Sequence, residues 1–111
     1  MHLAYEETFG PVASLFRFRT VDEAVALANA TEAGLAAYVY SSNASTLFSV
    51  GETLEAGMVG LNTGIVSSDA MPFGGVKQSG HGREGGIHHG IAEYCTVKSF
   101  ALGMIVSSPR R

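Results

Sequence analysis

Residues 20–62 decide the fold, and they read TVDEAVALANATEAGLAAYVYSSNASTLFSVGETLEAGMVGLN. Two short runs in this stretch, LAAYVY at 35–40 and MVGLN at 58–62, are bounded by turn-forming residues. The first run is rich in aromatic and β-branched side chains, which favour a pleated strand. We therefore predict a strand at each run, with the first strand buried.

Helical periodicity precedes the run at 35–40. Thr20 is placed to cap this first helix, and Glu23 three residues later completes the sequence of a capping box. Gly34 is predicted to end the helix, because glycine commonly follows the last helical turn. The apolar stripe of the helix comprises Val21, Ala24, Val25, Leu27 and Ala28.

A second helix is predicted between the two strands. Ser42 or Asn43 can cap its first turn, and Gly57 follows its end. Leu47, Val50 and Leu54 recur at spacings of three and four residues, so they share one helical face.

The pattern extends toward the N-terminus. Residues 12–18, VASLFRF, follow a Gly10-Pro11 turn signal and alternate apolar and polar positions toward their end. With this segment as a further strand, the element order is β-α-β-α-β. Short connections in this order predict an α/β fold with parallel strands joined by right-handed crossovers.

The remaining sequence is irregular. Residues 63–89 are glycine-rich and show no periodicity, which predicts a long structured loop with a function. A short helix is expected at 87–94 and a last strand at 96–102, TVKSFAL. This strand has no hairpin mate beside it in sequence, and an unpaired strand edge promotes association. We expect it to pair with another subunit.

Composition limits the possible partners and surroundings. The 111 residues carry a net charge of -3 with no Lys/Arg-rich run, which argues against a nucleic-acid partner. No apolar stretch approaches the roughly 20 residues that cross a bilayer, so no membrane contact is expected. The single cysteine, Cys95, cannot form an internal disulfide, which favours a reducing cytoplasm.

Two further patterns are weak. His88 and His89 are adjacent, so they cannot both face one ion from a helix, and no other ligands complete a metal set. Residues 80–85, GHGREG, have the letters of a dinucleotide fingerprint, but no strand precedes them and no helix follows within a βαβ unit. We predict neither a metal site nor a phosphate cradle here.

Three segments together resemble the aldehyde dehydrogenase superfamily: EETFGP at 6–11, GMVGLN at 57–62 and PFGGVKQSGHGRE at 72–84. The resemblance implies a C-terminal part of a catalytic domain at 1–95, an inter-subunit oligomerisation strand at 96–104 and a flexible tail at 105–111. It implies a larger, homo-oligomeric parent enzyme that uses NAD or NADP. The nucleophilic cysteine, the general-base glutamate and the oxyanion-hole asparagine would lie in segments that this chain does not match, so the chain alone is predicted to be inactive.

The resemblance also implies site residues. Glu7 matches a glutamate that contacts the nicotinamide-side ribose, and Phe9 an aromatic residue that packs beside the nicotinamide. Phe73 matches an aromatic residue of the substrate tunnel, although a loop anchor is the simpler interpretation of a Phe before Gly-Gly. Acidic surface pairs are common, so composition alone would leave Glu7 as a solvated residue.

The loop at 62–68, NTGIVSS, is similar to the succinate-semialdehyde dehydrogenase branch. There a serine helps to hold the distal carboxylate of the substrate, and Ser67 is the better match, with Ser68 second. Both hydroxyls could instead bond their own backbone. Glutarate semialdehyde or another ω-carboxyl aldehyde would fit the same interpretation, because a hydroxyl can donate to any carboxylate within reach.

One position departs from the family pattern. Thr96 stands where the family commonly has a glutamate that pairs with the arginine matching Arg83, so Arg83 is expected to turn to Glu84, Glu93 or solvent. An alternative hypothesis assigns the chain no catalysis: a docking protein that binds a full-length aldehyde dehydrogenase through the strand at 96–104.

Overall fold

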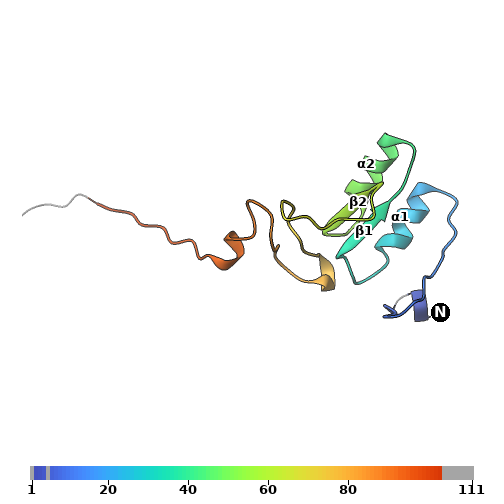
Figure 1. Ribbon diagram of the computed structural model, residues 1–111, viewed down its shortest axis with the longest axis horizontal. Coiled ribbons are helices and arrows are strands. Elements are labelled where there is room, and N and C mark those ends of the chain that lie inside the picture. The colour runs from blue at the N-terminus through green and yellow to red at the C-terminus, as the bar shows by residue number, and fades with distance from the viewer. Residues whose placement is uncertain (1, 5, 104–111) are drawn as a thin grey trace, which may run out of the picture.

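The computed structural model describes residues 2–4 and 6–103, which form a small α/β unit followed by an extended C-terminal segment (Figure 1). Its regular elements are, in chain order, the 3₁₀ helix η1 (His2–Ala4), α1 (Val21–Asn29), β1 (Ala36–Val39), α2 (Ala44–Thr53), β2 (Met58–Leu61), η2 (Lys77–Ser79) and η3 (Ala92–Tyr94). The helix predicted before the run at 35–40, the helix predicted between the two runs, and the strands near 35–40 and 58–62 are therefore confirmed, with shorter bounds.

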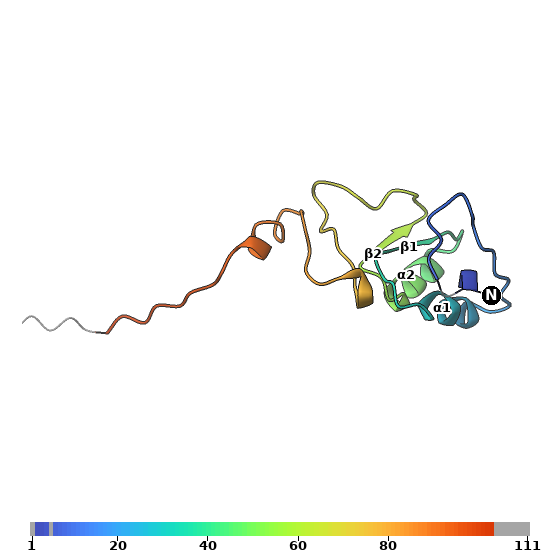
Figure 2. The same ribbon diagram turned by 90° about the horizontal axis from the view of Figure 1, so that it is seen from below.

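The two strands form a parallel sheet in which Ala36 pairs with Met58 and Val39 with Leu61. The chain passes from β1 to β2 through α2, as parallel strands require. A Cβ atom built on Gly51 of α2 would lie 3.1 Å from the Leu61 side chain, so α2 packs closely on this face. Figure 2 shows both helices on the same side of the sheet.

Local side-chain bonds explain where α1 begins. The Thr20 hydroxyl accepts from the backbone N–H of Glu23 at 3.2 Å, as the capping box predicts. The Glu23 carboxylate, however, accepts from the N–H of Arg19 at 2.7 Å. In a capping box this carboxylate would accept from the N–H of Thr20, so the second bond of the box is made one residue earlier, at Arg19.

Gly34 does not end α1, and that prediction is wrong. The helix ends at Asn29, with Ala30 as its C-cap. Gly34 instead lies where the backbone is crowded, because a Cβ atom there would be 2.6 Å from the carbonyl oxygen of Glu55. The glycine permits this close approach rather than a left-handed cap.

Asn43 caps α2, which settles the choice between Ser42 and Asn43. Its side-chain oxygen accepts from the N–H of Thr46 at 3.1 Å. The helix ends at Thr53, and Leu54 follows in an extended conformation. Gly57 lies beyond the end of the helix, where a Cβ atom would be 1.9 Å from the carbonyl oxygen of Gly74.

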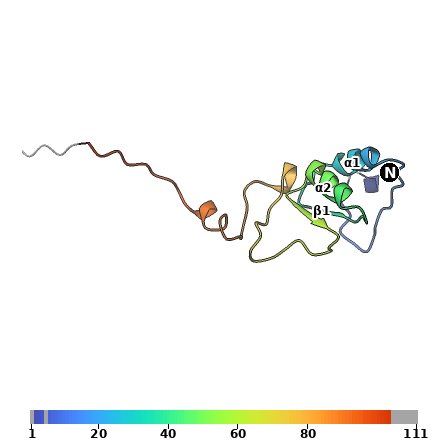
Figure 3. The same ribbon diagram turned by 90° about the horizontal axis from the view of Figure 1, so that it is seen from above.

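The prediction of a strand at 12–18 is wrong for this structure. These residues belong to an extended loop that leads from η1 to α1 (Figure 3), and they pair with neither β1 nor β2. Leu15 is 95% exposed. A strand exists only through its hydrogen-bonded neighbour, and the described residues supply none for this segment. The β-α-β-α-β order is thus reduced to α-β-α-β.

The prediction that 35–40 is buried is also wrong. Tyr38 is 48% exposed, and the buried apolar residues of the described chain are Met58 and Val66. A two-stranded sheet covered by helices on one side leaves its other face open. The core is consequently small, and it is centred on β2 and the loop that follows it.

The C-terminal part is less regular than predicted. A series of turns and η3 replace the helix expected at 87–94, and residues 96–103 run away from the α/β unit without regular structure (Figure 1). Val97 and Phe100 are 92% and 88% exposed. Among the described residues the segment 96–103 finds no intramolecular strand partner, so the predicted strand at 96–102 and its pairing with another subunit stay a prediction. The predicted tail at 105–111 lies outside the described residues.

Candidate functional site

The glycine-rich loop is attached to the α/β unit through residues 72–80, here called the motif loop. The N–H of Val76 donates to the carbonyl of Gly34, and that of Gln78 to the carbonyl of Glu32, both at 2.9 Å. The Ser79 hydroxyl accepts from the N–H of Gly34 at 2.8 Å. The motif loop is thus docked by backbone bonds on the connection between α1 and β1.

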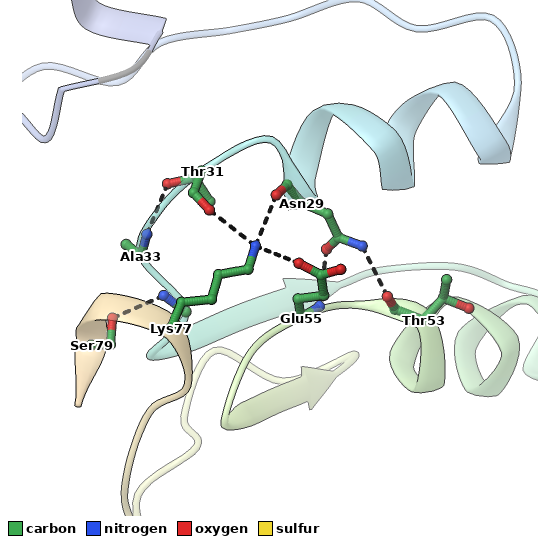
Figure 4. A network of polar contacts seen from close by, with 8 residues as sticks. Asn29, Thr31, Ala33, Thr53, Glu55, Lys77 and Ser79 are labelled. Carbon is green, nitrogen blue, oxygen red and sulfur yellow. Dashed lines mark hydrogen bonds and ion pairs between the residues drawn. The ribbon is translucent and has the colours of Figure 1, made fainter. Parts of the chain in front are cut away.

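Lys77 lies at the centre of this attachment (Figure 4). Its ammonium donates to the carbonyls of Asn29 and Thr31 at 2.8 and 3.0 Å, and its nitrogen lies 2.6 Å from a carboxylate oxygen of Glu55. An ammonium has three N–H donors, so these three acceptors satisfy it completely. A cation placed at the last carbonyls of α1 is also favoured by the helix dipole.

Asn29 connects the same region to the end of α2. Its side-chain N–H donates to the carbonyl of Thr53, and its side-chain oxygen accepts from the N–H of Glu55, each at 2.9 Å (Figure 4). Asn29 and Lys77 together join the ends of both helices to the motif loop. Three segments distant in sequence therefore meet at one polar cluster.

A second attachment closes the loop at Phe73. Phe73 and Glu84 exchange backbone hydrogen bonds of 2.7 Å in an isolated antiparallel bridge. Arg83 donates to the carbonyls of Gly75 and Gly82 at 2.8 and 2.7 Å. Among the described residues Arg83 thus pairs with neither Glu84 nor Glu93, because its Nη1 group donates to backbone carbonyls within the loop, and the side chain stays partly exposed to solvent, as one of the expected alternatives had it.

The carboxyl ends of the two strands are tied by Asn62. Its side chain accepts from the N–H of Ser41 and donates to the carbonyl of Ser41, both at 2.9 Å. Asn62 adopts a left-handed conformation with φ of 53°. This conformation turns the chain out of β2 and into the loop that carries Ser67.

Glu7 lines a cleft of about 750 Å³ between the N-terminal segment, the α1–β1 connection and η2. Glu55 and Ser79, which belong to the attachment of the motif loop, line it too. Phe9, Ser67 and Phe73 do not. The structure therefore places Glu7 on the same cleft as part of the motif loop, but it does not gather the four sequence-predicted residues into one pocket.

The other three predicted residues are exposed. Phe9 is 94% exposed and Phe73 42%, and Ser67 lies on the loop after β2. The Ser68 hydroxyl accepts from the N–H of Ala70 at 3.4 Å, which is the local backbone bond typical of loop serines. Ser67 makes no such side-chain bond among the described residues, so its hydroxyl is available to a ligand.

The residues present are chemically suited to one part of a nicotinamide dinucleotide. The Glu7 carboxylate can accept from two vicinal ribose hydroxyls, and it faces an open cleft. The exposed ring of Phe9 offers a flat apolar surface.

In residues 2–4 and 6–103, no three His, Cys, Asp or Glu side chains gather closely enough to hold a metal ion. Within the same residues no helix has the length and apolar character needed to cross a bilayer. Cys95 is a free, exposed thiol directly after η3.

Sequence reasoning missed Lys77, Asn29 and Asn62 as organising residues. Their partners lie 21 to 48 residues away along the chain, so no local pattern identifies them. The one available signal was Lys77 itself, a lysine within a glycine-rich loop. A loop without periodicity must be held by side-chain contacts, and a long charged side chain can make them.

The sequence matches the family model described as "Aldehyde dehydrogenase family" over residues 1–100. It is 52% identical over 103 residues to a succinate-semialdehyde dehydrogenase [NADP(+)] of Saccharomyces cerevisiae, which covers 93% of this chain and 20% of the relative. It is 55% identical over 103 residues to a 3-sulfolactaldehyde dehydrogenase of Pseudomonas putida, covering 93% and 21%. The chain thus spans about a fifth of the length of the curated relatives it matches.

The fold gives the same assignment. The crystal structure of succinate-semialdehyde dehydrogenase from Burkholderia pseudomallei superposes with a TM-score of 0.80 at 60% identity, over 85% of this chain and 19% of that protein. The α-β-α-β unit therefore corresponds to part of the aldehyde dehydrogenase fold. On the matched sequence and the superposed structure, this chain belongs to the aldehyde dehydrogenase family.

Proposed function

We propose that this chain forms part of an NAD(P)-dependent aldehyde dehydrogenase that oxidises succinate semialdehyde, or a related ω-carboxyl aldehyde, to the acid. The observation that carries the proposal is the match over residues 1–100 together with relatives named for succinate semialdehyde. The 3-sulfolactaldehyde relative acts on an aldehyde that also bears an anionic group. An anion remote from the aldehyde is therefore the feature we assign to the substrate.

In this proposal the chain supplies residues that line the cofactor and substrate sites, and it does not supply the nucleophile. Glu7 and Phe9 contact the ribose and the nicotinamide, and NAD(P)⁺ when bound supplies the hydride acceptor. Phe73 lines the substrate tunnel. Ser67 donates its hydroxyl to the distal carboxylate, which suits a side chain without a local backbone partner. Cys95 follows η3 and is remote from these residues in sequence, so we give it no catalytic role.

A chimaeric enzyme tests the proposal. The matching segment of the Burkholderia pseudomallei dehydrogenase is replaced by this chain, which leaves the host's own remaining segments in place. We expect NAD(P)-dependent oxidation of succinate semialdehyde with kcat/KM within about tenfold of the host, because wall residues of the same type fill the same places. Folded chimaera without turnover on any ω-carboxyl aldehyde would refute the proposal.

The docking hypothesis is separated by a second assay. The exposed apolar residues of 96–103 could add a strand to another subunit, and Val97 and Phe100 would then be covered. We propose this segment as the inter-subunit strand of a homo-oligomeric enzyme in a reducing cytoplasm. Co-purification of the chain with the intact host dehydrogenase, combined with an inactive chimaera, would favour a non-catalytic docking protein instead.

A further inference from the structure

The strongest feature outside the predicted site residues is the Lys77 ammonium. Three acceptors from two segments surround it, namely the carbonyls of Asn29 and Thr31 at the end of α1 and the carboxylate of Glu55 after α2. Its side chain is only 24% exposed. A surface lysine commonly keeps its ammonium in water and needs no acceptors from the protein. Three protein acceptors around one ammonium are therefore more than its solvation requires.

The backbone at Lys77 supports a specific role. Its φ is 54°, in the left-handed region that a lysine rarely adopts. The surrounding contacts must therefore hold the residue in this conformation. The N–H groups of Val76 and Gln78, directly before and after Lys77, both donate to the α1–β1 connection. The ammonium and these two N–H groups fix the loop to the same place.

The position of Phe73 depends on this attachment. Phe73 is paired with Glu84, and Arg83 donates to Gly75, so residues 73–84 form a closed loop with its own internal bonds. What joins this closed loop to the α/β unit on the η2 side is the contact set of residues 76–79. A shift at Lys77 would therefore move the Phe73 ring relative to the sheet.

We infer that Lys77 is a positioning residue, whose ammonium fixes the motif loop against the ends of α1 and α2 and thereby sets the place of Phe73 in the substrate wall. The inference rests on the proposed function for its effect on catalysis. The shape of the acceptor set matters as well as the charge, because the planar fork of an arginine cannot reproduce three acceptors arranged around one nitrogen.

The first test needs no activity. Amide hydrogen exchange of the full chain should show that Lys77→Met accelerates exchange of the Val76 and Gln78 amides by at least about tenfold. The Leu47 amide, which donates within the first turn of α2, should stay within about twofold and serves as the internal control. Unchanged exchange at Val76 and Gln78 would overturn the inference whether or not the enzyme proposal stands.

The second test measures catalysis in the chimaera. Lys77→Met should raise KM for succinate semialdehyde about tenfold, because a small displacement of Phe73 weakens the placement of the substrate. The KM for the cofactor should stay within about twofold. Lys77→Asn tolerates the left-handed backbone but lacks the ammonium, so it should behave like Lys77→Met. An equal rise of KM for succinate semialdehyde in Lys77→Met and Lys77→Asn assigns the effect to the missing ammonium.

Two further variants keep the result interpretable. Lys77→Arg should recover the parent KM only in part, and full recovery would contradict the geometric role. Should Lys77→Met fail to fold, Glu55→Gln removes the negative charge opposite the ammonium while keeping an amide oxygen as acceptor, and it should raise the same KM about threefold, a smaller change in the same direction. Glu52→Gln, at an exposed position of α2, is its matched control and should change neither the amide exchange nor the KM. A Glu55→Gln variant that leaves both exchange and KM unaltered would overturn the inference.

Discussion

The side chain of Asn62 accepts from the N–H of Ser41 and donates to its carbonyl, both at 2.9 Å, and so ties the end of β2 to the residue just past β1. The side-chain amide of Asn62 thus satisfies the N–H and the carbonyl of Ser41, which lie beyond the hydrogen-bonded pairs of the parallel strands. Asn62 also holds φ of 53°, which asparagine tolerates better than most residues. The turn out of the sheet therefore depends on both the side chain and the backbone of one residue.

Asn62→Ala should lower the free energy of unfolding by about 2 to 3 kcal/mol, since it loses both bonds and places a methyl group on a left-handed backbone. Asn62→Gly loses the same bonds without the backbone penalty and should cost about 1 kcal/mol less. Urea denaturation of the chain followed by circular dichroism measures both. An alanine variant more stable than the glycine variant would contradict the role assigned to the backbone.

The caps of the helices give a second prediction. Asn43→Ala should destabilise the chain by about 1 kcal/mol, because the N–H of Thr46 loses its acceptor. Ser42→Ala, one residue earlier, is the matched control and should change stability by less than about 0.5 kcal/mol. Comparison of the two urea midpoints decides whether Asn43 alone caps α2.

Gly57 should be the least replaceable glycine. A Cβ atom there would lie 1.9 Å from the carbonyl oxygen of Gly74, so the motif loop would have to leave the start of β2. Gly57→Ala is expected to cost about 3 kcal/mol or more. Gly64→Ala is its control, since the nearest atom to the new methyl group would be the Tyr40 hydroxyl at 3.6 Å. Thermal unfolding monitored on both variants should show a large fall in midpoint only for the first.

Sequence reasoning succeeded where the cause of structure is local. Thr20 and the pattern after it predict α1, because a cap and its acceptor lie three residues apart. The strands β1 and β2 follow from short apolar runs between turn formers. Right-handed parallel connection then leaves one arrangement for the α-β-α-β unit.

The failures share a different cause. Residues 12–18 have a strand-like pattern, yet a pattern cannot supply the neighbour that a strand needs. The attachment of the motif loop was equally hidden, since Lys77 reaches acceptors 46 and 48 residues away. The role of Ser67 stays a prediction, although its lack of a local bond distinguishes it from Ser68.

The measurement that tests the account most directly compares Ser67→Ala with Ser68→Ala in the chimaera, on succinate semialdehyde and on butanal, a four-carbon aldehyde without the carboxylate. Ser67→Ala should lower kcat/KM for succinate semialdehyde by about tenfold to a hundredfold, since a hydrogen bond to a charged group is lost, and should leave that for butanal within about twofold. Ser68→Ala should leave both values near those of the parent chimaera. Equal losses on the two aldehydes, or a loss confined to Ser68→Ala, would contradict the assignment of Ser67 to the distal carboxylate.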